Sequence, residues 1–88
     1  MIILNKLIYF TSMENTTMSF GSAIFHLKKG NRVSRKNWNG AGQYLELQTP
    51  DRNSKMTLPY IYIKTVQGDL VPWLASQSDI LANDWIIA

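Results

Sequence analysis

The sequence predicts an α+β domain, with one main N-terminal helix packed on a small, mostly antiparallel sheet and a short second helical turn before the C-terminal strand. Two observations predict this class. One segment places apolar residues at helical spacing, and several later segments alternate apolar and polar residues as strands do. The chain has 88 residues, which is enough for one domain but not for two.

The predicted helix covers residues 19–29. Ser19 is suited to cap its N-terminus, because a serine side-chain oxygen accepts a hydrogen bond from a first-turn amide. The apolar positions that follow share one helical face: Phe20, Ala23, Ile24 and Leu27. Gly30 is a typical helix stop. His26 lies off the apolar face, and we interpret it as a half-exposed polar residue.

The strands are predicted from four short segments that follow the helix. Residues 32–36 form the first, and the turn-rich segment NWNGAGQ separates it from the second, YLELQ. The polar loop TPDRNSKMT precedes the third, LPYIYIKT, whose isoleucines are expected to point inward. A hairpin turn centred on Gly68 leads to a short fourth strand that Pro72 terminates.

The second helical turn and the last strand lie at the C-terminal end. Ser76 is a plausible cap, and Asp79 follows it at the spacing of a capping box. The segment DWIIA then closes the chain as a strand. Trp85 lies within this apolar run, and we interpret it as a core residue because tryptophan is highly buried on average.

Residues 1–17 differ in character from the rest of the chain. The apolar segment MIILNKLIYF is followed by the polar segment TSMENTT. The apolar part is shorter than the ~20 residues that span a bilayer, and it lacks the features of a good signal peptide. Two interpretations stay open: an added strand, or an extension upstream of a second start at Met18.

The composition excludes several kinds of catalytic or metal site. The chain has no cysteine and one histidine, which excludes disulfides, thiolate sites and multi-histidine metal sites. Three aspartates, Asp69, Asp79 and Asp84, are scattered along the sequence, and each has a turn or cap role available. No glycine-rich phosphate loop is present. We therefore expect a binding protein with no catalytic residue, cofactor or metal, rather than an enzyme.

Two tryptophans next to turns are the best candidates for a binding surface. Trp38 lies in a glycine-bordered loop, and Trp73 precedes a row of small polar side chains. Each can fill the core or stack on a ligand ring, and the sequence leaves both alternatives open. Five of the nine lysines and arginines lie in residues 28–36. Of these, Arg35 and Lys36 could neutralise a pyrophosphate, or simply form a solvated face.

Two long segments carry a resemblance to a known family. MSFGSAIFHLKKGNRVSRKNWNG and VPWLASQSDILANDWII resemble the second Thoeris anti-defence family, small phage and prophage proteins. The resemblance covers residues 18–88, and the paired tryptophan segments are its most specific part. The positions that match the family pattern are Phe20, Gly21, Ala23, Val33, Arg35, Trp38, Asn39, Gly40, Val71, Pro72, Trp73, Ser76, Asp79, Asp84 and Trp85.

The resemblance implies a function that spacing alone does not reveal. Members of this family are non-catalytic and sequester the cyclic ADP-ribose isomer of Thoeris defence, and some also bind cyclic oligonucleotide signals. They form homotetramers with pockets between protomers and act in the cytoplasm of the infected or lysogenic bacterial host. A membrane partner is not expected, and a nucleic-acid partner is disfavoured. The ligand-binding candidates are Trp38, Asn39, Trp73, Ser76, Gln77 and Asp79 by resemblance, with Arg35 and Lys36 added from charge.

Two departures from the family pattern bear on these expectations. Residues 1–17 precede the usual start, and the loop of residues 49–57 is short, which affects ligand choice if that loop wraps the ligand. The alternative function is a single-stranded nucleic-acid-binding or generic interaction module. It is motivated by the basic residues 28–36 and by the aromatic side chains.

Overall fold

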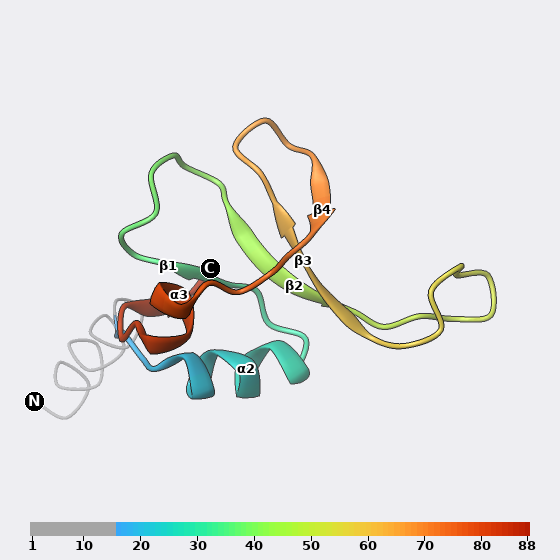
Figure 1. The fold of residues 1–88 in the computed structure, drawn as a ribbon, viewed down its shortest axis with the longest axis horizontal. Coiled ribbons are helices and arrows are strands. Elements are labelled where there is room, and N and C mark those ends of the chain that lie inside the picture. Colours follow the sequence, from blue (N-terminus) through green and yellow to red (C-terminus); the bar gives the residue numbers. More distant parts are fainter. Residues whose placement is uncertain (1–15) are drawn as a thin grey trace, which may run out of the picture.

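A computed structural model describes residues 16–88 as a five-stranded antiparallel sheet with two helices (Figure 1). The strand order is β4-β3-β2-β1-β5, and every pair of neighbours is antiparallel. The α+β prediction is therefore confirmed. Residues 1–17, for which the sequence left two interpretations open, lie almost wholly outside the described residues. The elements are α2 Phe20–Lys28, β1 Val33–Arg35, β2 Tyr44–Gln48, β3 Tyr60–Lys64, β4 Leu70–Pro72, α3 Gln77–Leu81 and β5 Trp85–Ile87.

Helix α2 begins and ends as the sequence predicts. The Ser19 Oγ accepts a hydrogen bond from the Ser22 amide at 3.2 Å, and Gly30 adopts a φ of 91°, which only glycine adopts readily. Ala23 and Leu27 are fully buried on the face toward the sheet. His26 is half-buried, as expected for a residue beside that face.

The core is small and centres on one tryptophan. The fully buried side chains are Ala23, Leu27, Val33, Leu45 and Trp85, and the core prediction for Trp85 is confirmed. Half-buried neighbours complete the core, and among them Leu47, Ile61 and Ile63 occupy the inward positions that the alternating pattern predicts. Because the core is this small, each buried side chain contributes a large share of the free energy of unfolding.

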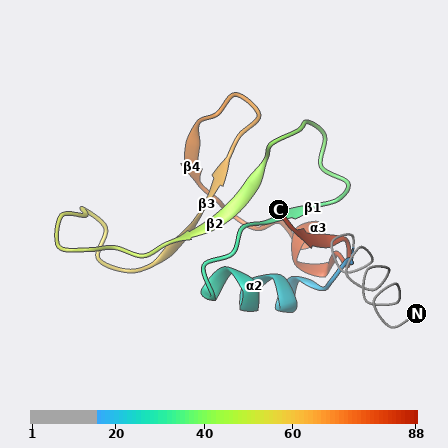
Figure 2. The same ribbon diagram turned by 180° about the vertical axis from the view of Figure 1, so that it is seen from behind.

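The two faces of the sheet have different environments. Cross-strand partners lie on the same face, and the pairs Val33 with Leu45 and Leu45 with Ile63 define the face toward α2. Helix α2 contacts β1, β2 and β5 on that face. Seen from behind, the β2–β3 connection of residues 49–59 extends away from both helices (Figure 2). Neither described helix combines the length and the hydropathy that a membrane-spanning segment needs.

Strand β4 forms one edge of the sheet, and Pro72 protects that edge. The Trp73 amide donates to the Ile61 carbonyl at 3.0 Å, so amides at alternate positions of β4 face β3. Pro72 falls at the intervening position, where its missing N–H would face the open edge. This edge therefore lacks a donor that an added strand would need. The turn before β4 is centred on Gly68, at a φ of 93°, as predicted.

Candidate functional site

The candidate site is built around Trp85. Trp38, from the loop after β1, lies edge-on to the Trp85 ring with centroids 5.6 Å apart, and Trp73, which follows β4, does so at 6.0 Å. Phe20 of α2 adds a third ring at 5.4 Å. Such pairs contribute ~0.5–1.5 kcal/mol each beyond their buried area. Tryptophans that lie 35 positions apart in the sequence are thereby fixed on one buried ring.

Trp38 and Trp73 combine the two roles that the sequence left open. Both side chains are half-buried and pack against the core, and both keep part of their surface in solvent. Each therefore has a fixed orientation and an accessible region. A contact between these exposed regions and a ligand stays a prediction.

Arg35 joins two elements beside this aromatic cluster. Its Nε donates to Asp84 Oδ1 at 2.8 Å and its Nη1 donates to Asp79 Oδ1 at 3.1 Å. The three side chains are only 15–20% exposed. Interpreting the aspartates as scattered was therefore wrong for this pair, because Arg35 lies opposite Trp85 in the sheet and α3 carries Asp79 to the same place.

This arrangement changes what Arg35 offers to a ligand. Two of its donors already serve carboxylates, so an incoming pyrophosphate would have to compete for the guanidinium. Lys36 is exposed, and its side chain has no ion-pair partner within residues 16–88. Lys36 is thus the more available cation of the two that the sequence proposed, although contact of either one with a ligand stays a prediction.

Both aspartates stay ionised at neutral pH. The hydrogen bond from Arg35 lowers the pKa of Asp84 below its ordinary value of 3.8, despite some burial. Burial raises the pKa of Asp79, but hydrogen bonds from Ser76 and Arg35 outweigh it and leave a lowered value. The same ion pairs raise the pKa of Arg35, chiefly through Asp84. The network therefore carries one positive and two negative charges.

Asp79 also caps helix α3 and holds the central tryptophan. The Ser76 Oγ accepts from the Asp79 amide at 3.1 Å and the Asp79 Oδ2 accepts from the Ser76 amide at 3.2 Å, which confirms the predicted capping box. The Asp79 carbonyl accepts from Trp85 Nε1 at 3.0 Å. Because one residue makes all these contacts, the start of α3, the ion pairs and the aromatic cluster form one connected unit.

We expect Ser76→Ala to lower the free energy of unfolding by about 1 kcal/mol, because it removes the cap oxygen of a five-residue helix. Ser78→Ala is the matched control: its hydroxyl lies 3.0 Å from the Ser76 Oγ but is not the cap. Urea denaturation followed by circular dichroism measures both variants. Equal stability of the two would contradict the importance of the capping box.

The remaining predicted residues lie outside this unit. Asn39 and Gln77 are exposed, and among the described residues their side chains make no hydrogen bond that would fix them. The Asn39 carbonyl accepts from Gln43 Nε2, which orders the loop after Trp38. Gly40 has a φ of 96°, and a Cβ there would lie 2.5 Å from the Val66 side chain, so this glycine is needed for packing within the chain.

Sequence reasoning missed two members of the unit. Phe20 was assigned only to the helix face, and Asp84 was not recognised as a partner of Arg35. A signal for the second was present, since Asp84 immediately precedes the strand that contains Trp85. In the structure the Asn37 amide also donates to the Asp84 carboxylate at 3.1 Å. The pairing of β1 with β5 had to be known before that signal could be used.

Comparisons with known proteins agree with one another. The sequence model of the Thoeris anti-defense 2-like domain matches residues 18–88. A curated protein of Bacillus phage SP01, named Thoeris anti-defense 2, is 36% identical over 85 residues, which cover 82% of this chain and 96% of that protein. The residues matched by the domain model include the whole aromatic cluster and the Arg35 ion pairs.

Proposed function

The chain belongs to the Thoeris anti-defense 2-like family, and from this premise we propose that it inhibits Thoeris anti-phage defence by sequestering a cyclic ADP-ribose-type (glycocyclic ADP-ribose) signal without converting it. The family membership and the name of the phage relative support the anti-defence role. One observation of this chain supports the binding role above others: Trp38 and Trp73 are both half-buried and fixed on the Trp85 ring.

This geometry suits a planar, polar ligand. A base stacked on an aromatic side chain gains about 1–3 kcal/mol. Rings that are already held in place lose little conformational freedom when a ligand binds, so more of that gain remains as affinity. Gln77 lies at the start of α3 and offers its side-chain amide for ribose hydroxyls, whereas the Ser76 hydroxyl already donates to Asp79 Oδ2 at 2.8 Å and accepts from the Asp79 amide. In this proposal Lys36 faces the pyrophosphate, while Arg35 holds the site together.

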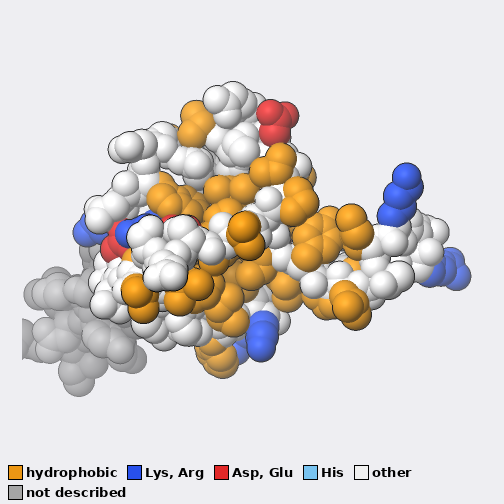
Figure 3. All heavy atoms as spheres, in the orientation of Figure 1, with side chains coloured by type: hydrophobic (Ala, Val, Ile, Leu, Met, Phe, Trp, Pro, Cys, Tyr) orange, Lys and Arg blue, Asp and Glu red, His pale blue; other side chains and the backbone are white. Residues whose placement is uncertain are grey.

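We propose further that the protein is a homo-oligomer, with the ligand pocket between protomers. Large apolar side chains are exposed to an extent unusual for a monomer, with Leu74 at 91%, Leu58 at 75% and Leu81 at 74%. Hydrophobic side chains gather in a band from the helices to the base of the β2–β3 connection (Figure 3). Burying this band against another copy would also enlarge a small core. The family resemblance favours a tetramer.

Recovery of the intact ligand tests sequestration. The protein is incubated with glycocyclic ADP-ribose, free ligand is removed by filtration, and the protein is denatured. We expect the denatured sample to release the same cyclic compound in an amount that matches the binding sites. Release of a linear or cleaved product would show an enzyme and contradict the proposal. Repeating the assay with cyclic dinucleotides tests whether the site also accepts cyclic oligonucleotide signals.

Replacing Trp38 separates stacking from simple burial. We expect Trp38→Leu to weaken ligand binding about 5- to 150-fold, which corresponds to the loss of ~1–3 kcal/mol of stacking. Trp38→Phe keeps an aromatic ring and should retain most of the affinity. Isothermal titration calorimetry measures the dissociation constants, and circular dichroism verifies the fold. Equal affinities for the two folded variants would show that Trp38 is not a stacking surface.

A further inference from the structure

The face of the sheet that points away from α2 carries a row of tyrosines. In each strand, the residues between the core positions point to this outer face. Tyr62 on β3 pairs with Glu46 on β2, and Tyr60 pairs with Gln48, so these four side chains lie side by side on the outer face. Tyr44 completes the row. Neither described helix contacts β3, the strand with two of these tyrosines, at more than one or two positions. This outer face is separate from the Trp85 cluster, which packs on the opposite side.

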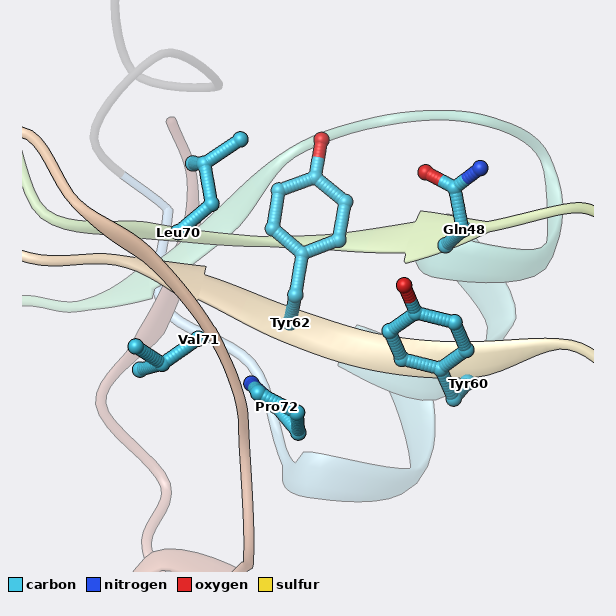
Figure 4. Close-up of a pocket in the computed structure, with 6 residues that line it drawn as sticks. All are labelled: Gln48, Tyr60, Tyr62, Leu70, Val71 and Pro72. Carbon is cyan, nitrogen blue, oxygen red and sulfur yellow. The ribbon is translucent and has the colours of Figure 1, made fainter. Parts of the chain in front are cut away.

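The outer face contains a shallow hollow with the chemistry of a base-binding surface. The hollow of ≈ 90 Å³ is lined by Gln48, Tyr60, Tyr62, Leu70, Val71 and Pro72. The two rings and the Gln48 amide rise from the same side of β2 and β3 (Figure 4). The Gln48 side chain makes no hydrogen bond to another described residue, which leaves both its donors and its acceptor for a ligand.

No charged side chain of a described residue lines the hollow, but Glu46, Arg32 and Lys64 lie near it, and both basic side chains lie over the Tyr44 ring. Glu46 is the acidic side chain of the row, and it already accepts from Arg32 Nε at 3.0 Å and from the Tyr62 hydroxyl at 2.9 Å. Lys64 lies at the other end of β3, with its Nζ 5.6 Å from the Tyr44 ring centroid and no carboxylate partner in residues 16–88. Glu46 is thus neutralised, and the Lys64 charge is available.

We propose that this outer face binds single-stranded nucleic acid, with bases on Tyr60 and Tyr62, the Gln48 amide at a base edge and Lys64 against a phosphate. Aromatic rings on the open face of a sheet are a recurrent way to bind unpaired bases. Alternate residues of a strand lie about 6.6 Å apart, so adjacent rings leave room for successive bases. The site uses none of the residues of the signal site, and it is also separate from the basic residues 28–36 on α2 and β1, apart from Arg32.

A second copy of the chain is a less suitable occupant for this face. Interfaces between identical subunits are more apolar than other surfaces and are depleted in lysine and glutamate at their centre. The outer face instead has a tyrosine hydroxyl, an amide, Glu46 and Lys64. Leu74 and Leu81, two of the most exposed apolar side chains, belong to the helical end of the chain, whereas Leu70 borders the hollow itself.

Fluorescence anisotropy with a labelled single-stranded deoxyadenosine octanucleotide tests the proposal with the full chain. We expect binding that Tyr60→Leu weakens about 5- to 150-fold, because leucine keeps apolar volume but removes the stacking ring. Tyr60→Phe should bind nearly as well as the wild type. Lys64→Gln should reduce the slope of log affinity against log salt by about 0.7, the value expected for one phosphate contact on a single strand.

Four outcomes would overturn the proposal. The first is that the wild type does not bind the oligonucleotide, and the second is that Tyr60→Leu and Tyr60→Phe bind it with equal affinity. The third is that binding is lost in Trp38→Leu but not in Tyr60→Leu, and the fourth is that light scattering finds a changed molar mass for Tyr60→Leu. The third outcome would place the oligonucleotide at the Trp85 cluster, and the fourth would make the face a contact between copies. If Tyr60→Leu does not fold, Gln48→Ala takes its place, and its affinity must fall. Sequestration of the cyclic signal should be intact in both variants, so the two proposals fail independently.

Discussion

Replacing Trp85 with alanine is expected to lower the free energy of unfolding by about 3–5 kcal/mol, the typical cost of truncating a large core aromatic. For a domain of 88 residues this is a large fraction of the total, which is commonly about 5–15 kcal/mol. Trp85 is fully buried, three aromatic rings pack on it, and its Nε1 donates to Asp79. The substitution removes all of these contacts together.

A matched control lies on the same strand. Ile87 is two residues further along β5 but 45% exposed, so Ile87→Ala should cost far less. Thermal melts followed by circular dichroism compare the melting temperatures of the two variants. Trp85→Phe shows how much of the stability a smaller aromatic ring retains. If Trp85→Ala and Ile87→Ala melt at the same temperature, Trp85 does not have the central position in the core that we assign to it.

The helix and strands could be predicted because their signals are local. The Ser19 cap, the apolar face of α2 and the Gly30 stop lie within twelve residues, and the structure ends the helix within one residue of the predicted bounds. The strands could be predicted as well, because their alternation of apolar and polar residues reflects a sheet with one face against the core. Leu45 is buried, and its neighbours Tyr44 and Glu46 are half-buried.

The connections within the site could not be predicted in the same way. Asp79 has a sufficient local explanation as a helix cap, and nothing near it in the sequence indicates that Arg35 also binds its carboxylate. That contact depends on β5 pairing with β1 and not with a strand nearer in sequence. Likewise, the sequence could not decide between core and surface for Trp38, because the structure makes it partly both.

Arg35→Met is expected to destabilise the fold by about 2 kcal/mol at neutral pH. It removes the shared partner of two carboxylates whose side chains are 15% and 20% exposed. Breaking a fully buried pair costs about 3–5 kcal/mol, and partial solvation reduces that figure here. The melting temperature should fall by about 10 °C. Ligand affinity should fall as well, because Arg35 fixes α3 relative to the Trp38 loop.

Arg32→Met is the matched control for this variant. Its ion pair with Glu46 has a similar N···O distance of 3.0 Å, but the Arg32 side chain is 52% exposed, so its removal should lower the free energy of unfolding far less than removal of Arg35. Arg35→Lys keeps the positive charge but loses the forked guanidinium geometry, so its melting temperature should lie between those of the wild type and Arg35→Met. Equal melting temperatures for Arg32→Met and Arg35→Met would show that Arg35 has no special structural role.

The effect of Arg35→Met should depend on pH in a defined direction. The pKa values of Asp79 and Asp84 are lowered in the folded protein, so their ionised forms stabilise it fully above the ordinary carboxyl pKa of 3.8. That contribution is lost as the pH falls through the lowered pKa values. The stability difference between wild type and Arg35→Met should therefore be largest near neutral pH and shrink below about pH 4. A difference that stays constant from pH 7 to about pH 2.5 would show that Arg35 stabilises the site through packing of its side chain and not through its two ion pairs.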